Sequence, residues 1–328
     1  MKLRTSMILL LVFSWLVQKV LADTVDIREW LVPWANSEPG PAYVDTGGRV
    51  WFVGQRADYV ANFSPETGEF NRYDLQAGTA PTALIVDSNR TIWFASNKRR
   101  HIGSLNPSTG RVDEFSMPDR KAKDPRAMTI DQAGDIWFTV EDGNFIGRLM
   151  VANGEVVLIP IPTKKFRPHG IVVDSDGNPW ATSSERNMLL RVSLSDMSVT
   201  EFETPNVNSR FRKIVATSDG TVWFTDYALG QIGRFDPRNG EFSEWPLPGG
   251  SDSKPSGIAV DRDDRIWLVE TGRIPNSLIG FDTGTETFLT VTDIPSGAGS
   301  VDHMHYYEPA GEVWFGTRTN YIGRAKVH

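Results

Sequence analysis

The sequence predicts an all-β protein, and more specifically a seven-bladed β-propeller with four strands in each blade. Two observations lead to this prediction. Tryptophans recur along the chain at spacings in the low forties, a period that is typical of propeller blades. The 328 residues include 29 Gly and 20 Pro and contain no long amphipathic run, which disfavours helical repeats. The tryptophans that mark the seven repeats are Trp51, Trp93, Trp137, Trp180, Trp223, Trp267 and Trp314.

Each repeat contains the same parts in the same order. A Pro-x-x-apolar segment opens it, as at 125–128, and a β-branched strand then leads to an Asp-rich turn, as at 174–177. A Trp-Phe strand follows at 137–138, and an Ile-Gly-Arg strand follows that at 146–148. A glycine-containing turn, as at 237–240, then leads to an outer strand. This order predicts four antiparallel strands in each repeat, with the large aromatic side chain between neighbouring blades.

The two ends of the chain are expected to share one blade. The last repeat stops soon after Ile-Gly-Arg at 322–324 and lacks an outer strand. The segment at 27–33 aligns with the outer strand at 242–248. We therefore expect the N-terminal strand to complete the seventh blade and close the ring, which would cover two sheet edges.

Composition excludes several functional classes. With no Cys, the chain can form no disulfide, no thiolate metal site and no cysteine nucleophile. The formal charge is −7 and no basic run is longer than that at 98–100, so no nucleic-acid partner is expected.

The first 22 residues have the features of a signal peptide. Lys2 and Arg4 precede an apolar run at 6–17, and the small-x-small pattern at 20–22 fits a cleavage site. We expect one propeller domain over residues 23–328, exported to the periplasm or secreted. We also expect no membrane span after the signal peptide is removed, and a monomer that binds a small molecule.

The repeat motifs resemble those of the virginiamycin B (streptogramin B) lyase family over roughly residues 26–328. The motifs that carry this resemblance are Trp-Phe-Thr at 137–139 and 223–225, the Ile-Gly-Arg triplets, Pro-His-Gly-Ile at 168–171, and the outer strand at 244–248. The resemblance implies an enzyme whose active site lies on the last two blades and uses Mg²⁺.

Carried over residue by residue, the resemblance assigns the general base to His303. The histidine of the family's penultimate blade is replaced by Ser256, and the two Mg²⁺-binding Glu positions are replaced by Val301 and Arg318. A hard divalent cation needs oxygen ligands, which neither Val301 nor Arg318 supplies.

Two repeat positions are expected to face one mouth of the central channel. Eleven residues before each repeat Trp stand Gly40, Thr82, Arg126, His169, Arg212, Ser256 and His303. Three residues after each Trp stand Gly54, Ser96, Val140, Ser183, Asp226, Glu270 and Thr317. The first set is almost wholly polar, which indicates a wet mouth rather than a core layer.

These positions supply the candidate site residues. His303 and His169 are the catalytic candidates, and Arg126, Arg212 and Ser256 are the candidates for substrate binding. A divalent metal, Mg²⁺ or Ca²⁺, would be held by Glu270, Asp226 and His305. The alternative is a polar plug in which these histidines, carboxylates and arginines pair with one another.

The sequence leaves two functions open. One is an exported lyase or hydrolase that opens an ester or lactone linkage of a small molecule. The other is a non-catalytic propeller that binds a ligand or a protein over one face.

Overall fold

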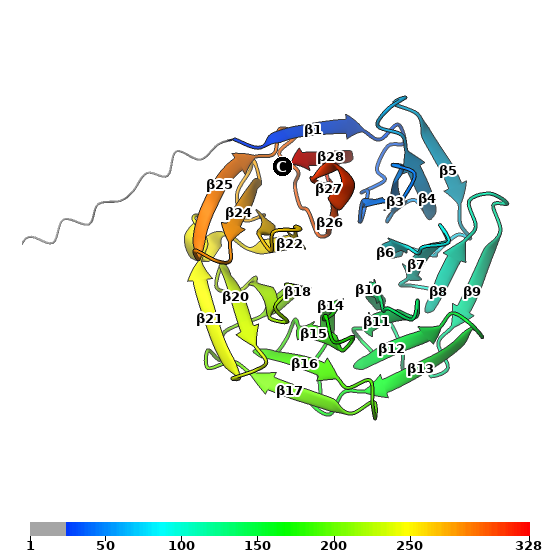
Figure 1. Ribbon diagram of the computed structural model, residues 1–328. Coiled ribbons are helices and arrows are strands. Elements are labelled where there is room, and N and C mark those ends of the chain that lie inside the picture. The colour runs from blue at the N-terminus through cyan, green and yellow to red at the C-terminus, as the bar shows by residue number, and fades with distance from the viewer. Residues whose placement is uncertain (1–23) are drawn as a thin grey trace, which may run out of the picture.

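The protein is a ring of seven four-stranded antiparallel sheets arranged as blades around a central opening (Figure 1). The structure, a computed structural model, describes residues 24–328, so the expected signal peptide at 1–22 lies outside the described residues. The prediction of an all-β, seven-bladed propeller with four strands in each blade is confirmed.

In blades one to six the chain runs from the inner strand to the outer strand, and in blade seven the N-terminal strand supplies the outer strand. Blades one to four comprise β2 (Tyr43–Val44), β3 (Val50–Gly54), β4 (Tyr59–Phe63) and β5 (Phe70–Asp74); β6 (Pro81–Val86), β7 (Ile92–Ser96), β8 (His101–Leu105) and β9 (Val112–Ser116); β10 (Pro125–Ile130), β11 (Ile136–Val140), β12 (Phe145–Met150) and β13 (Glu155–Pro160); and β14 (Pro168–Val173), β15 (Pro179–Ser183), β16 (Met188–Val192) and β17 (Val199–Glu203). Blades five to seven comprise β18 (Phe211–Ala216), β19 (Val222–Asp226), β20 (Gln231–Asp236) and β21 (Glu241–Pro246); β22 (Pro255–Val260), β23 (Ile266–Glu270), β24 (Ser277–Asp282) and β25 (Thr287–Asp293); and β26 (Met304–Tyr307), β27 (Glu312–Gly316), β28 (Tyr321–Lys326) and β1 (Asp26–Leu31).

Helix is confined to two single turns in the described part of the chain, η1 (Gly250–Asp252) and η2 (Glu308–Ala310). Over residues 24–328, no helix has the length and apolar character needed to cross a membrane.

The N-terminal strand closes the ring, as the sequence predicts. β1 pairs antiparallel with β28 from Asp26↔Lys326 to Leu31↔Tyr321. Trp30 on β1 stacks on Trp314 of the same blade, with ring centroids 5.5 Å apart, and also contacts Phe63 of blade one at 5.1 Å. The strand therefore completes blade seven and joins it to blade one.

The repeat tryptophans fill the space between neighbouring blades. Trp137 of blade three is fully buried and packs in one cluster with Ile171 and Leu190 of blade four. Its indole Nε1 donates a hydrogen bond to Asp131 Oδ2 at 2.8 Å, and the guanidinium of Arg148 lies over its ring at 5.2 Å. The same Asp–Trp bond joins Asp45 to Trp51, Asp87 to Trp93, Asp174 to Trp180, and Asp261 to Trp267. The aspartates of these turns therefore stabilise the blades.

The glycine of Ile-Gly-Arg makes room for the phenylalanine of Trp-Phe. A Cβ added to Gly147 would lie 2.2 Å from the ring of Phe138 on the neighbouring strand. Any larger residue would push that ring out of the core.

A β-bulge near the start of the inner strand determines which side chains reach the channel. In blade five the register shifts between Phe211 and Ile214, and blades three, four and six shift at the equivalent place. The threonine of Trp-Phe-Thr supports the bulge, because Thr225 Oγ1 accepts a hydrogen bond from the backbone N–H of Lys213 at 3.1 Å. A bulge interrupts the alternation of side chains, so adjacent residues can both lie at the channel mouth.

Candidate functional site

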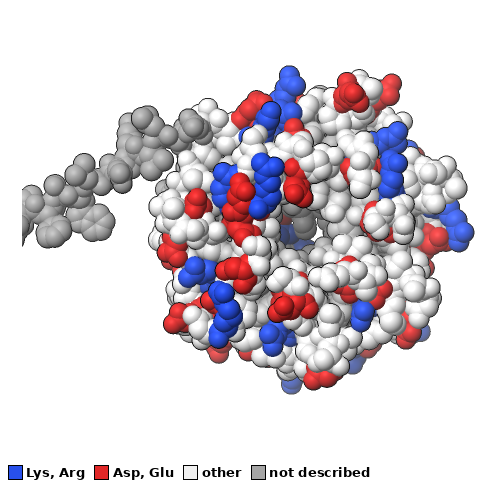
Figure 2. All heavy atoms as spheres, viewed as in Figure 1, with Lys and Arg blue, Asp and Glu red and all other residues white. Residues whose placement is uncertain are grey.

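The inner strands of all seven blades line a central cavity of about 350 Å³. Figure 2 shows the hollow at the centre of one face, with acidic and basic side chains spread around it. The wall is largely apolar, and the residues that form it include Ala42, Leu84, Ile85, Met128, Ile171, Ile214 and Ile258. Lys213, Asp302 and His303 add charged and titratable groups to this wall.

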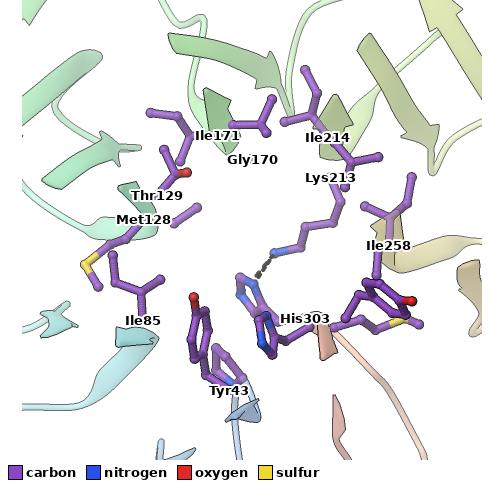
Figure 3. A pocket seen from close by; sticks show the side chains of 18 of the residues that line it. Tyr43, Ile85, Met128, Thr129, Gly170, Ile171, Lys213, Ile214, Ile258 and His303 are labelled. Atoms are coloured by element: carbon purple, nitrogen blue, oxygen red, sulfur yellow. Dashed lines mark hydrogen bonds between the residues drawn. The ribbon is translucent and has the colours of Figure 1, made fainter. Parts of the chain in front are cut away.

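Lys213 and His303 meet in the channel (Figure 3). The Nζ of Lys213 lies 3.1 Å from His303 Nε2 and 3.5 Å from His303 Nδ1. Lys213 extends from β18 of blade five, whereas His303 directly precedes β26 of blade seven. Only 7% of Lys213 is exposed, so its amine has left bulk water for a contact with an imidazole.

Burial lowers the pKa of both groups, which favours their neutral forms. It lowers the pKa of Lys213 to about 7, against the opposing charge of Asp302 and with help from Arg126. Burial also lowers the pKa of His303 well below its usual value, and the nearby Lys213 charge lowers it further. At neutral pH, His303 is therefore a neutral proton acceptor beside a lysine that is close to its own midpoint.

Asp302 lies next to this pair and stays ionised. Its Oδ1 accepts hydrogen bonds from Ser256 Oγ at 3.2 Å and Ser300 Oγ at 3.1 Å, and its Oδ2 lies 3.3 Å from a guanidinium nitrogen of Arg318. Burial works to raise the pKa of Asp302, but the charges of Lys213, His303 and Arg318 outweigh it and hold that pKa well below the usual range. Ser256 thus orients a carboxylate at the mouth.

A second group of charges surrounds Glu141 of blade three. Its carboxylate contacts Arg126 Nε at 3.2 Å, Arg167 Nη2 at 3.2 Å and His169 Nδ1 at 3.5 Å. Burial works to raise the pKa of Glu141, but the hydrogen bond from His169 and the arginine charges lower it to about 2. Burial lowers the pKa of His169 to about 3, so this histidine is neutral near pH 7.

Arg212 is bound to an aromatic ring and not to a carboxylate. Its guanidinium lies over Tyr227, 3.5 Å from the ring centroid. Burial lowers the pKa of Arg212, while the charges of Tyr227, Asp302 and Glu141 act the other way. Its side chain has no ion pair or hydrogen bond with any other residue in 24–328, so its N–H groups are available to a ligand.

The expectation that Asp226 and Glu270 face the mouth of the channel is not met. Asp226 Oδ1 accepts a hydrogen bond from Arg210 N at 3.1 Å, and Glu270 Oε1 accepts one from Ser253 Oγ at 2.8 Å. Both carboxylates are buried and bind the segment that leads into the inner strand of their own blade. Ser96 and Ser183, which stand at the same repeat position, bind the equivalent segments through the backbone oxygens of Thr79 and Phe166. This position therefore faces inter-strand connections and not the channel.

His305 is also separated from those carboxylates. It lines the channel and stacks on Tyr43 of blade one, with ring centroids 3.8 Å apart. Burial lowers its pKa to about 4, and no charged partner opposes that shift. The proposed metal set of Glu270, Asp226 and His305 is therefore not assembled in the described structure.

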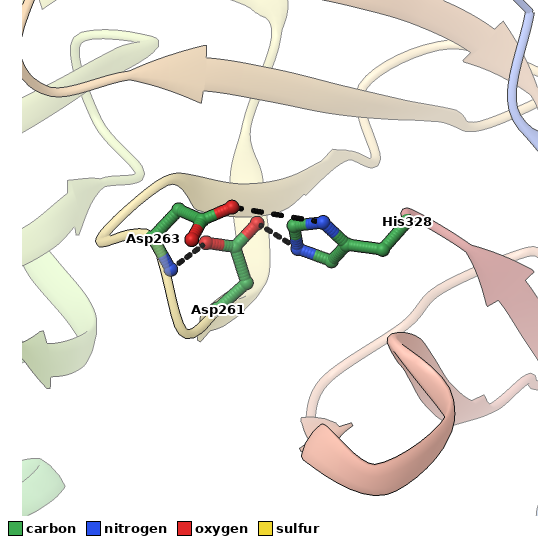
Figure 4. A group of neighbouring side chains, drawn as sticks. All are labelled: Asp261, Asp263 and His328. Atoms are coloured by element: carbon green, nitrogen blue, oxygen red, sulfur yellow. Dashed lines mark hydrogen bonds and ion pairs between the residues drawn. The ribbon is translucent and has the colours of Figure 1, made fainter.

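A different group has the residue types and spacing to hold a metal ion. Asp261, Asp263 and His328 bring one ligand atom each to within 4.8 Å of one another (Figure 4). Arg265 already contacts all three, at 3.0 Å from Asp261, 3.0 Å from Asp263 and 2.7 Å from His328. Asp261 also accepts the indole hydrogen bond of Trp267, so it has a structural role as well.

Comparison with known proteins places the chain in a family. The model of the virginiamycin B lyase family matches residues 18–277, which is well over half of the chain. The chain belongs to the virginiamycin B lyase family. No protein of curated function matches it in sequence.

Solved structures of this family share the fold. Virginiamycin B lyase from Staphylococcus aureus is 24% identical, with a TM-score of 0.84, and the match covers 93% of this chain and 100% of that one. A streptogramin B lyase structure is also 24% identical, with a TM-score of 0.83 and coverage of 93% and 98%. A catalytically inactive variant of the Staphylococcus aureus enzyme with quinupristin is 24% identical, with a TM-score of 0.81 and coverage of 92% and 100%.

The metal positions implied by the virginiamycin B lyase family do not fit Mg²⁺ in this chain. Val301 is fully buried in the core between blades six and seven and offers no ligand atom from its side chain. Arg318 brings a positive charge to within 3.3 Å of the carboxylate of Asp302. A hard cation at that place would lose the ligands of both family positions, would compete with Arg318 for the carboxylate of Asp302, and would be repelled by the guanidinium.

Two residues of the site were missed from the sequence, and each has a recognisable signal. Lys213 stands ten residues before Trp223, and the residues at this position in the other repeats are Pro41, Ala83, Ala127, Gly170, Gly257 and Met304. A lysine at a position that is otherwise occupied by small or apolar residues departs from the repeat pattern, and such departures tend to mark functional sites. Glu141 stands four residues after Trp137, one residue beyond the position that was expected to face the channel.

Proposed function

We propose that the protein is a lyase that opens an ester or lactone linkage of a small molecule at the channel mouth. One observation carries this proposal: the 3.1 Å contact between Lys213 Nζ and His303 Nε2 in the wall of a cavity of about 350 Å³. A buried lysine and a half-buried histidine, both with lowered pKa values and in contact beside a cavity, are more typical of an active site than of a scaffold.

The reaction we propose is an elimination. The base removes a proton from the carbon next to the one that bears the ester oxygen. The electron pair of that C–H bond becomes a C=C double bond, and the C–O bond breaks. Its electron pair leaves on the carboxylate, so atoms and charge balance without water or an oxidant.

His303 is the proton acceptor in this proposal, and Lys213 sets its protonation state. The pKa of His303 lies well below the working pH, so the proton must pass on to a stronger base, and Lys213, with a pKa of about 7, is that base. When Lys213 is neutral, its Nζ can receive the proton that His303 takes from the substrate. His169, which is neutral beside Glu141, is the second candidate for a base.

Negative charge develops on the departing carboxylate. Arg212, whose guanidinium has no acidic partner in the described chain, is suited to stabilise it. Arg126 lies in the same mouth but is already paired with Glu141. Ser256 has a positioning role in this scheme, through its hydrogen bond to Asp302.

No step of this scheme passes through a metal ion. If the protein binds Mg²⁺ or Ca²⁺, the group of Asp261, Asp263 and His328 is the place we propose for it, and the cation would have to displace Arg265. We also propose that the first 22 residues direct export and that the mature chain acts as a monomer on its small-molecule substrate.

The test is a product analysis by mass spectrometry. Purified protein is incubated with quinupristin and a panel of small lactones, with the His303→Ala variant as the matched control. A lyase opens a lactone to an acyclic product of unchanged mass, whereas a hydrolase adds the mass of one water. We expect the unchanged mass with the wild type only. A product heavier by one water would replace the lyase with a hydrolase, and no product from any compound would favour the non-catalytic propeller.

A further inference from the structure

The central channel is a pocket that the chemistry proposed above does not fully use. Around the opening that Lys213 and His303 share, much of the wall is formed by apolar side chains of the inner strands, among them Ile85, Met128 and Ile171 (Figure 3). A volume of about 350 Å³ corresponds to roughly ten water molecules. The apolar side chains of this part of the wall offer water no hydrogen-bond partner, so the replacement of water there by an apolar group is favourable.

One side of this pocket is aromatic. Tyr43 and His305 stack with their ring centroids 3.8 Å apart, and both line the cavity. His305 is neutral at physiological pH, because burial lowers its pKa to about 4. The stacked pair therefore offers an uncharged, flat surface to a hydrocarbon or an aromatic group.

The residue that precedes Lys213 in the chain, Arg212, carries a guanidinium without an acidic partner in the described residues. Arg212 lies next to Lys213 in the chain and stacks on Tyr227, and it makes no salt bridge with residues 24–328. The other arginines of the mouth are paired: Arg126 and Arg167 with Glu141, and Arg318 with Asp302. An anionic group would find its donors at Arg212.

We propose that the substrate is the ester or lactone of an acid with an apolar arm, that this arm occupies the channel beside Tyr43 and His305, and that Arg212 binds the carboxylate that ester opening releases. This inference rests on the proposed lyase function, because the carboxylate is the leaving group of that reaction. It adds the chemical class of the substrate and the place of each of its parts.

The test uses straight-chain carboxylates as product mimics and measures binding, not turnover. Hexanoate, octanoate and decanoate are titrated into the wild-type protein by calorimetry, with hexanol and octanol as uncharged controls. Each added methylene should tighten binding about fourfold while the channel has room. Octanoate should bind more tightly than octanol. Affinity that does not change with chain length would overturn the channel assignment.

Two variants separate the channel from the mouth. Ile171→Trp, which fills the channel, should abolish the dependence on chain length, and Met128→Trp is a second variant of the same kind if the first fails to fold. Val157→Trp adds the same side chain at an exposed position of blade three and should behave like the wild type.

Arg212→Leu should remove the preference for octanoate over octanol, and Arg238→Leu on an outer turn should retain it. A preference that survives Arg212→Leu would overturn the anion assignment.

These results are independent of the lyase test. Chain-length-dependent binding without turnover of any ester would leave the channel and mouth assignments standing and would contradict only the proposed reaction. Turnover without chain-length-dependent binding would contradict only the substrate class.

Discussion

The amine of Lys213 reaches from blade five to the imidazole of His303 on blade seven, and their nitrogen atoms approach to 3.1 Å. The two residues are 90 positions apart in the chain. Their contact exists only because the propeller brings the inner strands of all blades around one channel. Both groups are shifted towards their neutral forms, and this shift makes them suitable for proton transfer.

The first prediction concerns the pH dependence of the reaction. If Lys213 must be neutral, kcat/KM should rise with pH and level off above about pH 7, since burial lowers the Lys213 pKa to about 7. Lys213→Arg, which stays charged, should lose most activity and show no such rise. A wild-type profile that is flat from pH 5 to pH 9 would contradict this role of Lys213.

The second prediction concerns stability. The pKa of Lys213 is lowered from 10.5 to about 7 on folding, so the unfolded chain binds one more proton between these values. The free energy of unfolding therefore rises with pH across that window, by at most about 1.4 kcal/mol per pH unit. Lys213→Met should be more stable than the wild type at pH 7, with an advantage that shrinks towards pH 10. Denaturant unfolding of both proteins at several pH values measures this difference in stability, and Lys326→Met, at an exposed position, is the control. A stability advantage of Lys213→Met that does not change with pH would contradict the prediction.

The third prediction identifies the base. His303→Ala should lower kcat by roughly 10²–10⁴, the contribution of a positioned general base, and leave the thermal unfolding temperature little changed. His328→Ala, at the group formed with Asp261, is the matched control and should retain activity. Should His303→Ala remain active, His169 becomes the candidate and its alanine variant should be the inactive one.

The fourth prediction concerns Glu270. Glu270→Ala leaves Gly249 N–H and Ser253 Oγ without their acceptor and should cost about 1–3 kcal/mol of unfolding free energy. The metal content of the Glu270→Ala variant, measured by elemental mass spectrometry, should equal that of the wild type, because the Glu270 carboxylate binds a loop and not a metal ion. The exposed Glu241→Ala should change neither quantity. Loss of a bound divalent ion in Glu270→Ala would restore the metal role.

The fifth prediction concerns ring closure. Removal of residues 24–33 takes away β1 and exposes β28 as an edge, so the shortened protein should aggregate or unfold at a much lower temperature. Trp30→Ala, which removes the contacts with Trp314 and Phe63, should cost roughly 3 kcal/mol. Val207→Ala, a change at a residue that is 67% exposed, is the control. Unchanged melting after removal of β1 would show that closure is not needed.

The sequence by itself determined the architecture. Most repeats contain a Trp, an Asp in a turn and an Ile-Gly-Arg triplet or a close relative of it. Together these residues specify one blade, because they contact one another within the repeat. Trp137, for example, bonds to Asp131 and lies under Arg148, all within one repeat. The N-terminal strand was also readable, since its sequence repeats that of an outer strand.

The tertiary structure decided which side chains face the channel. Counting from each Trp placed His303 at the channel, whose wall it lines, but it also placed Asp226 and Glu270 there, and these bind inter-strand connections instead. A count along the chain does not show which way the end of the second strand faces, and on the inner strand a bulge breaks the alternation of side chains. Lys213 enters the channel at this bulge and meets a histidine from two blades away, and local sequence patterns carry no information about such a contact.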